Sequence, residues 1–148
     1  MSKTDECNFY RAFESAYSLE HLPRISDCQV SNIQDMCYFC LRLKEINIDF
    51  DNWDLSSIAN DTYQTEGGWH KGCESLRQIP MSYYNKIFQT KTIGKGSYYS
   101  VYNSLAYGCY NIDEIIDMPV MVLDKYTSNV FNDTFKDNYR LKNFTFKV

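Results

Sequence analysis

The spacing of hydrophobic and polar residues predicts helices throughout the first half of the chain. Apolar side chains recur every three or four residues over 5–22, and Pro23 marks the end of this stretch. The same spacing returns from Ser31 to about Ile46, and Ser31-Asn32-Ile33-Gln34 fits a capping box. We therefore expect two amphipathic helices before residue 47.

Three further helices are predicted around the middle of the chain. Asp54 is placed to cap a short helix that carries Leu55 and Ile58. Trp69–Ile79 has one apolar face and is followed by Pro80, and Ser82–Gln89 repeats the apolar spacing.

The second half mixes helix and strand signals. Tyr98–Tyr110 has the tyrosine-rich alternation of strands, and Phe144–Val148 alternates in the same way. Around Pro119, a helix starting near Met118 and a strand over Val120–Leu123 both stay open. No internal repeat is evident. The prediction is one α+β domain over 1–148, with a helical N-terminal half, a mixed C-terminal half and a subdivision near Gly67-Gly68.

Composition narrows the class of protein. The 148 residues are 44% hydrophobic and 23% charged, which excludes a disordered chain. The net charge of -4 conceals an asymmetry, because there are 5 Lys/Arg against 12 Asp/Glu up to His70 and 10 against 7 afterwards. A basic second half could steer a charged partner, but an acidic domain is not typical of strong nucleic-acid binders.

The cysteines and the N-terminus suggest a compartment. The first residues lack the basic and apolar regions of a signal peptide, and no stretch has the about 18 apolar residues of a membrane span. Six irregularly spaced cysteines in a chain with an adequate core indicate reduced thiols. We expect a cytoplasmic or nuclear protein that does not bind membranes.

One constellation has the spacing of a zinc site. Cys37-x-x-Cys40 is followed by His70-x-x-Cys73, and two short ligand pairs separated by a loop are the usual supply for tetrahedral zinc. Trp69-His70-Lys71-Gly72-Cys73 resembles the W-H-x-x-C step of LIM and PHD-type zinc fingers, which implies zinc as a cofactor. The alternative, which the apolar spacing favours, is that Cys37 and Cys40 pack in the core beside Ile33 and Met36.

Tyrosine, 13 residues in all, supplies a candidate binding surface. Tyrosine gives a large contact area at low entropic cost, and neighbouring lysines add positive charge. The residues that we predict to form this surface are Tyr83, Tyr84, Lys91, Lys95, Tyr98, Tyr99 and Tyr102.

These observations favour a binding function over catalysis. With His21 and His70 as the only histidines, general-base options are few, and no standard catalytic motif is present. We expect a non-enzymatic, intracellular interaction or regulatory domain that binds a protein, similar in composition to accessory proteins by which large DNA viruses act on host proteins. The alternative is a zinc-stabilised domain, through Cys37, Cys40, His70 and Cys73, that contacts protein or single-stranded nucleic acid.

Overall fold

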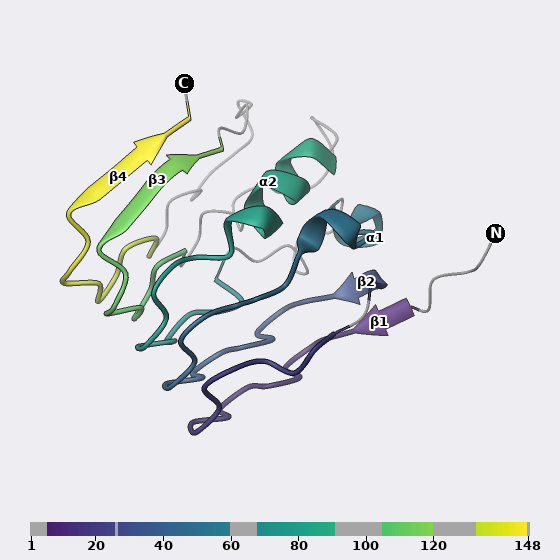
Figure 1. Ribbon diagram of the computed structural model, residues 1–148, viewed down its shortest axis with the longest axis horizontal. Coiled ribbons are helices and arrows are strands. Elements are labelled where there is room, and N and C mark those ends of the chain that lie inside the picture. Colours follow the sequence, from purple (N-terminus) through teal and green to yellow (C-terminus); the bar gives the residue numbers. More distant parts are fainter. Residues whose placement is uncertain (1–5, 26, 60–67, 91–104, 120–132, 148) are drawn as a thin grey trace.

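The chain folds into a stack of similar coils. The computed structural model describes residues 6–25, 27–59, 68–90, 105–119 and 133–147. Figure 1 shows the coils side by side in chain order, from purple to yellow. Within the described residues, backbone hydrogen bonds between neighbouring coils define five of them: coil 1 (6–22), coil 2 (29–48), coil 3 (68–79), coil 4 (105–118) and coil 5 (133–147).

The hydrogen bonds that join the coils fall at equivalent positions. The Phe13 amide donates to the Met36 carbonyl at 2.8 Å, and the Cys37 amide donates to the Trp69 carbonyl at 3.0 Å. Ala106 repeats this position with a bond to Thr134 at 2.7 Å. Two residues later a second equivalent set includes Gly72 to Tyr107 at 2.8 Å. Each coil thus satisfies the backbone of its predecessor, which is the arrangement of a solenoid.

Within a coil, the chain bends every three residues. In coil 2 the Cys40 amide donates to the Cys37 carbonyl, and the Leu43 amide donates to the Cys40 carbonyl. Coils 1, 3 and 4 repeat both bonds at equivalent residues. Every third side chain therefore points inward in coils 2 to 4, and one of these positions holds a leucine or isoleucine in each described coil: Leu19, Leu43, Leu76, Ile112 and Leu141.

Left-handed residues recur along the coils, and Arg11, Asp35 and Asp133 are left-handed in three of them. One further left-handed position, four residues later, is present in every described coil, where it breaks the turns and prevents a helix. Its φ values lie between 56° and 76° in coils 2 to 4. Only glycine adopts this region without a cost of roughly 1–2 kcal/mol, so the two glycines of this column fit it best. The column consists of Ser15, Phe39, Gly72, Gly108 and Asp137.

The short strands and helices lie where the chain enters or leaves the turns. The parallel pairs are β1 (Glu6–Asn8) with β2 (Gln29–Asn32), and β3 (Glu114–Met118) with β4 (Asn143–Phe146). Helices η1 (Phe50–Asn52), α1 (Ser56–Ala59) and α2 (Met81–Thr90) cover the middle of the stack, as Figure 1 shows.

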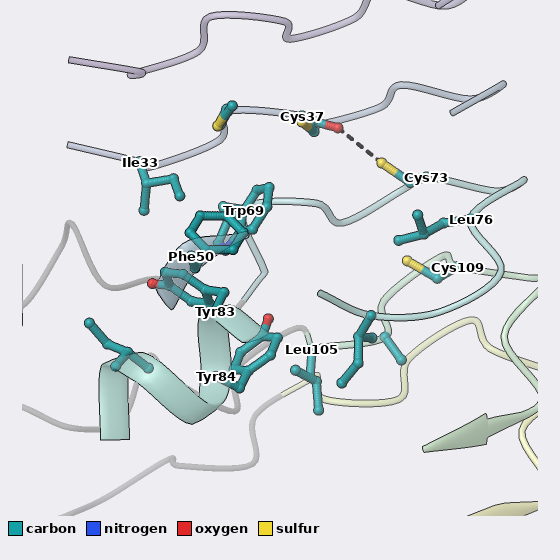
Figure 2. Close-up of a cluster of buried hydrophobic side chains, with 14 of the residues drawn as sticks. Ile33, Cys37, Phe50, Trp69, Cys73, Leu76, Tyr83, Tyr84, Leu105 and Cys109 are labelled. Carbon is teal, nitrogen blue, oxygen red and sulfur yellow. Dashed lines mark hydrogen bonds between the residues drawn. The ribbon is translucent and has the colours of Figure 1, made fainter. Parts of the chain in front are cut away.

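The buried residues form one continuous cluster across coils 2 to 4. Trp69 is fully buried at its centre, with its ring 6.0 Å from that of Phe50 and 5.5 Å from that of Tyr83 (Figure 2). The helices thus contribute side chains to the same core as the coils, and the molecule is a single compact domain.

The predicted fold class, an α+β domain with a helical N-terminal half, is wrong. Residues 9–19, 33–43 and 69–77 form turns instead of helices. The inward spacing of three residues imitates the three- and four-residue spacing of a helix, which is why the pattern misled. The proposed capping box is also wrong, because the Asn32 side chain accepts from the Gln34 amide at 2.9 Å in a turn that follows β2.

Several local predictions are confirmed. The Asp54 carboxylate accepts from the Ser56 amide at 2.9 Å at the start of α1, and α2 covers the predicted 82–89 segment. The alternating C-terminal segment contains β4, whereas residues 105–110 form turns and not a strand. The rest of the Tyr98–Tyr110 segment and the Val120–Leu123 segment lie outside the described residues.

The structure also overturns the expectation that the chain lacks a repeat. The left-handed column repeats at unequal intervals, which range from 24 residues, between Ser15 and Phe39, to 36 residues, between Gly72 and Gly108. These unequal intervals conceal the period in the sequence. No helix in the described segments is both long and apolar enough to cross a bilayer.

Candidate functional site

The stacking of coils 2 and 3 brings the four predicted zinc ligands into two columns. Cys37 and His70 occupy equivalent positions of neighbouring coils, and so do Cys40 and Cys73. All four side chains are buried, as the alternative of core packing requires for Cys37 and Cys40.

The thiols of this region form a ladder that follows the stack. Each one lies near a carbonyl oxygen of the preceding coil: Cys40 Sγ is 2.9 Å from Phe13 O, and Cys73 Sγ is 3.1 Å from Cys37 O (Figure 2). Cys109 Sγ continues the ladder at 3.7 Å from His70 O. An S–H donor at each step satisfies a buried carbonyl lone pair, so the ladder stabilises contact between coils.

An asparagine ends the ladder in coil 5. The Asn138 side chain donates to the carbonyls of Cys109 and Ile112 at 3.1 and 3.3 Å. Its own carbonyl oxygen accepts from the amides of Arg140 and Leu141. In coil 5 the Asn138 side-chain amide thus donates to carbonyls of the preceding coil, as the thiols do in coils 2 to 4. Its N–H groups are stronger hydrogen-bond donors than S–H groups.

The ladder requires protonated thiols. Burial raises the pKa of Cys109 to about 12, and contact with Cys40 together with burial raises the pKa values of Cys37 and Cys73. Contact with the Cys37 and Cys73 side chains instead lowers the pKa of Cys40 to about 4. A thiolate at Cys40 could not donate to Phe13 O, so this step of the ladder exists only when the Cys40 thiol is protonated.

The geometry does not arrange these residues around a metal. Among the described residues, no group of three or more His, Cys, Asp or Glu side chains is placed to hold an ion. The zinc alternative therefore stays a prediction, for which we give a test below.

His70 is a buried neutral base. Its Nε2 lies 2.8 Å from the Tyr84 hydroxyl, and its Nδ1 has no hydrogen-bond partner. Complete burial lowers the pKa of His70 to about 3, because an imidazolium there would lose its hydration. The residue is therefore uncharged at neutral pH and is enclosed by the core.

The predicted tyrosine surface is not assembled as such by the described residues. Tyr83 and Tyr84 are fully buried, with their ring centres 5.1 Å apart, so neither ring offers a face to a partner. The remaining residues of that surface, Lys91, Lys95, Tyr98, Tyr99 and Tyr102, lie outside the described residues.

A furrow crosses the stack where coil 3 leaves it. After Ile79, Pro80 directs the chain into α2, while the neighbouring coils continue. Three cavities of about 350, 360 and 270 Å³ follow this departure. The first two share Lys44 and Arg77, and the last two share Ile79 and Met81, so the three adjoin one another along the outgoing segment of coil 3, and we call them together the furrow.

One wall of the furrow is an unpaired strand edge. β3 pairs with β4 on one side, and no backbone bond joins it to coil 3 within the described chain. The Asp113 carbonyl accepts from Lys142, and the Asp117 amide donates to Thr145, both on the β4 side. Because successive residues of a regular strand present their backbone groups to opposite sides, alternation from Asp113 turns those of Ile116 toward the furrow. The strand is irregular after this point, since Asp117 is left-handed and the Met118 carbonyl accepts from Lys147 on the β4 side.

The middle of the furrow is apolar where the second and third cavities meet, and charged residues, among them Glu45 in the second cavity, line the rest of it. Ile79, Met81 and Ile116 lie along it, and the Ile116 side chain is 46% exposed. One end carries Lys44, Arg77 and Arg140 beside Tyr110, and the other end carries Glu114. Residue patterns alone did not single out this site, although Arg77 belongs to the most basic stretch of the chain and Tyr110 to its tyrosine-rich part.

Comparison with known proteins adds no assignment: neither the family models nor the curated proteins nor the solved structures gave a significant match.

Proposed function

We propose that this protein is a non-enzymatic interaction domain that binds an extended segment of a partner protein in the furrow. The observation that carries the proposal is the edge of β3 that is unpaired within the described chain, together with the exposed Ile116 side chain on it. An extended peptide can add to such an edge through main-chain hydrogen bonds, with alternate side chains entering the apolar middle of the furrow. Stacked coils commonly offer binding surfaces of this extended kind.

The charges of the furrow support a protein partner over a nucleic acid. Lys44, Arg77 and Arg140 would suit a phosphate backbone at one end, but Glu45 and Glu114 farther along would repel it. A peptide can match both ends, because its acidic and basic side chains can be placed separately.

A binding role also agrees with the state of the nucleophiles. All six cysteines are free, and five of them are buried. The buried thiols of the ladder are bonded to backbone carbonyls, which suits a structural role in a reducing compartment. His70 is enclosed by the core and is poorly placed to exchange protons with a substrate.

The test is a selection of extended peptides from a display library, followed by titration of the winners by fluorescence polarisation. Ile116→Lys should weaken binding at least tenfold, whereas Tyr17→Lys, at an exposed aromatic residue outside the furrow, should change it less than twofold. N-methylation of alternate peptide amides should abolish binding, and methylation of the others should not. Peptides that bind both variants equally would contradict the proposal.

A further inference from the structure

The basic end of the furrow is assembled from four consecutive coils. Its cavity of about 350 Å³ is lined by Lys44 of coil 2, Arg77 of coil 3, Tyr110 of coil 4 and Arg140 of coil 5. Glu74 is the single carboxylate among the lining residues, so three cations face one anion. Because each cation comes from a different coil, only the stacked fold brings them together.

The Arg140 side chain is held in place before any ligand arrives. Its Nη1 donates to Asn111 Oδ1 at 3.3 Å, and Asn111 Nδ2 donates to the Ser75 carbonyl at 3.3 Å. This chain of bonds links coils 3, 4 and 5. On the adjacent residue the Tyr139 ring stacks on Tyr110, with ring centres 6.0 Å apart and planes within 14°.

The other two cations differ in how far they are neutralised. Lys44 Nζ lies 3.0 Å from Glu20, and the hydrogen bond from Lys44 lowers the pKa of that carboxyl group. Arg77 makes no ion pair with any residue that the structure describes. The guanidinium of Arg77 therefore lines the cavity with its donors available to a ligand, next to the fixed guanidinium of Arg140.

We propose that this end of the furrow is a subsite for an anionic side chain, a carboxylate or a phosphate, of the bound partner segment. The inference rests on the proposed function, since it assigns the chemistry of one position in the peptide. Arginine donors suit either group, because the planar guanidinium can direct two parallel N–H bonds at two oxygens. The apolar middle of the furrow would then receive the residues on one side of this anion.

The test uses two simple probes, inorganic phosphate and hexaglutamate, titrated at low salt into the full chain labelled with ¹⁵N. Side-chain signals of Arg77, Asn111 and Arg140 should shift together. Arg77→Gln should lower the affinity about tenfold, as expected for loss of a charge-assisted hydrogen bond. Arg24→Gln, at an exposed arginine outside the furrow, should leave the affinity within twofold.

The outcomes distinguish a phosphate ligand from a carboxylate ligand, and they test the anionic subsite separately from the proposed peptide-binding function. Binding of phosphate alone assigns a phosphorylated segment, and binding of hexaglutamate as well assigns acidic residues. Equal affinity of wild type and Arg77→Gln for both probes would overturn the subsite. If phosphate still binds but no peptide depends on Ile116, the proposed function fails and the subsite stands. If peptides bind and their affinity depends on Ile116 but not on Arg77, the proposed function stands and the subsite fails.

Discussion

The two sides of the stack follow different rules. On the turn side, which contains the left-handed column and the thiol ladder, coils 1 to 4 repeat the same turn bonds, and the left-handed residue recurs in all five described coils. On the return side, where each coil leaves its turns, one coil continues into β3 and another into α2. Repetition lets each coil stabilise its neighbour, and departure from repetition creates the furrow. We therefore expect stability to depend on the turn side and binding on the return side.

The largest expected effect is on the core behind the turns. Trp69→Ala should lower the free energy of unfolding by about 3–5 kcal/mol, since a fully buried indole is removed between three aromatic rings. Trp69→Phe should cost much less, because the indole Nε1 has no hydrogen-bond partner to lose. Chemical denaturation measures both. Equal losses in the two variants would mean that the ring system at this position is not the centre of the core.

Acid should destabilise the turn side through His70. Its folded pKa of about 3 lies below the unfolded value of about 6.5, so below pH 6.5 the unfolded chain takes up the proton preferentially. The free energy of unfolding should therefore fall by about 2 kcal/mol from pH 6.5 to pH 5, a window above the titration of most carboxylates.

Two variants and one direct measurement check this assignment. His21→Gln changes an exposed histidine and should keep the full pH dependence, whereas His70→Gln should lose most of it. If His70→Gln does not fold, an NMR titration of the wild type decides: the His70 ring signals should not titrate between pH 7 and 4.5. A midpoint near 6.5 would show that the ring is accessible to solvent.

A smaller effect is expected at the left-handed column. A Cβ on Gly72 would lie 2.3 Å from the Phe39 ring at a φ of 76°, so Gly72→Ala should cost about 2 kcal/mol. In the double variant with Phe39→Ala, the part of this stability loss that comes from the clash should disappear, and the part that comes from the left-handed backbone should stay. Thermal unfolding of the single and double variants measures the coupling, and strictly additive losses would rule out the contact.

The thiol ladder should tolerate exchange of sulfur for oxygen. Cys73→Ala removes a donor to the Cys37 carbonyl and should cost about 1 kcal/mol, while Cys73→Ser keeps a donor and should cost less. A chelator should not change the melting temperature of the wild type. In the zinc-stabilised alternative, serine substitution would abolish folding, and metal analysis would find one equivalent of zinc.

The smallest effect on stability is expected in the furrow. Ile116→Lys changes a half-exposed side chain on the free edge of β3 and should alter the free energy of unfolding by less than about 0.5 kcal/mol. The same change should weaken peptide binding at least tenfold, as proposed above. A loss of more than 2 kcal/mol would mean that this edge belongs to the structural part of the molecule, and the contrast between the two sides would fail.

Local chemistry could be predicted from the sequence, and the stacking could not. The Asp54 cap, the α2 segment and the burial of Cys37 and Cys40 follow from neighbouring residues, and the structure has all three. The helices predicted in the first half failed because three-residue turns and helical turns bury nearly the same positions. The left-handed residue that separates them is a glycine in only two of the five described coils.

A usable signal was present for the repeat and the site. Cys40-x-x-Leu43-Lys44, Cys73-x-x-Leu76-Arg77 and Cys109-x-x-Ile112-Asp113 share one pattern. Aligning these three segments would have predicted that Lys44 and Arg77 are neighbours on adjacent coils. The fixed position of Arg140 could not be foreseen, because it depends on bonds through Asn111 to coil 3.

The unequal intervals of the left-handed column have a consequence for how this chain can change. Neighbouring coils join through the same turn bonds whether 24 or 36 residues separate them. Segments between coils can therefore gain or lose residues while the turns keep their register. An engineered insertion on the return side should be accepted, whereas a single residue added between Cys40 and Leu43 would displace every bond downstream in that coil. Insertions and deletions are therefore tolerated in the segments between the coils and not within the turns.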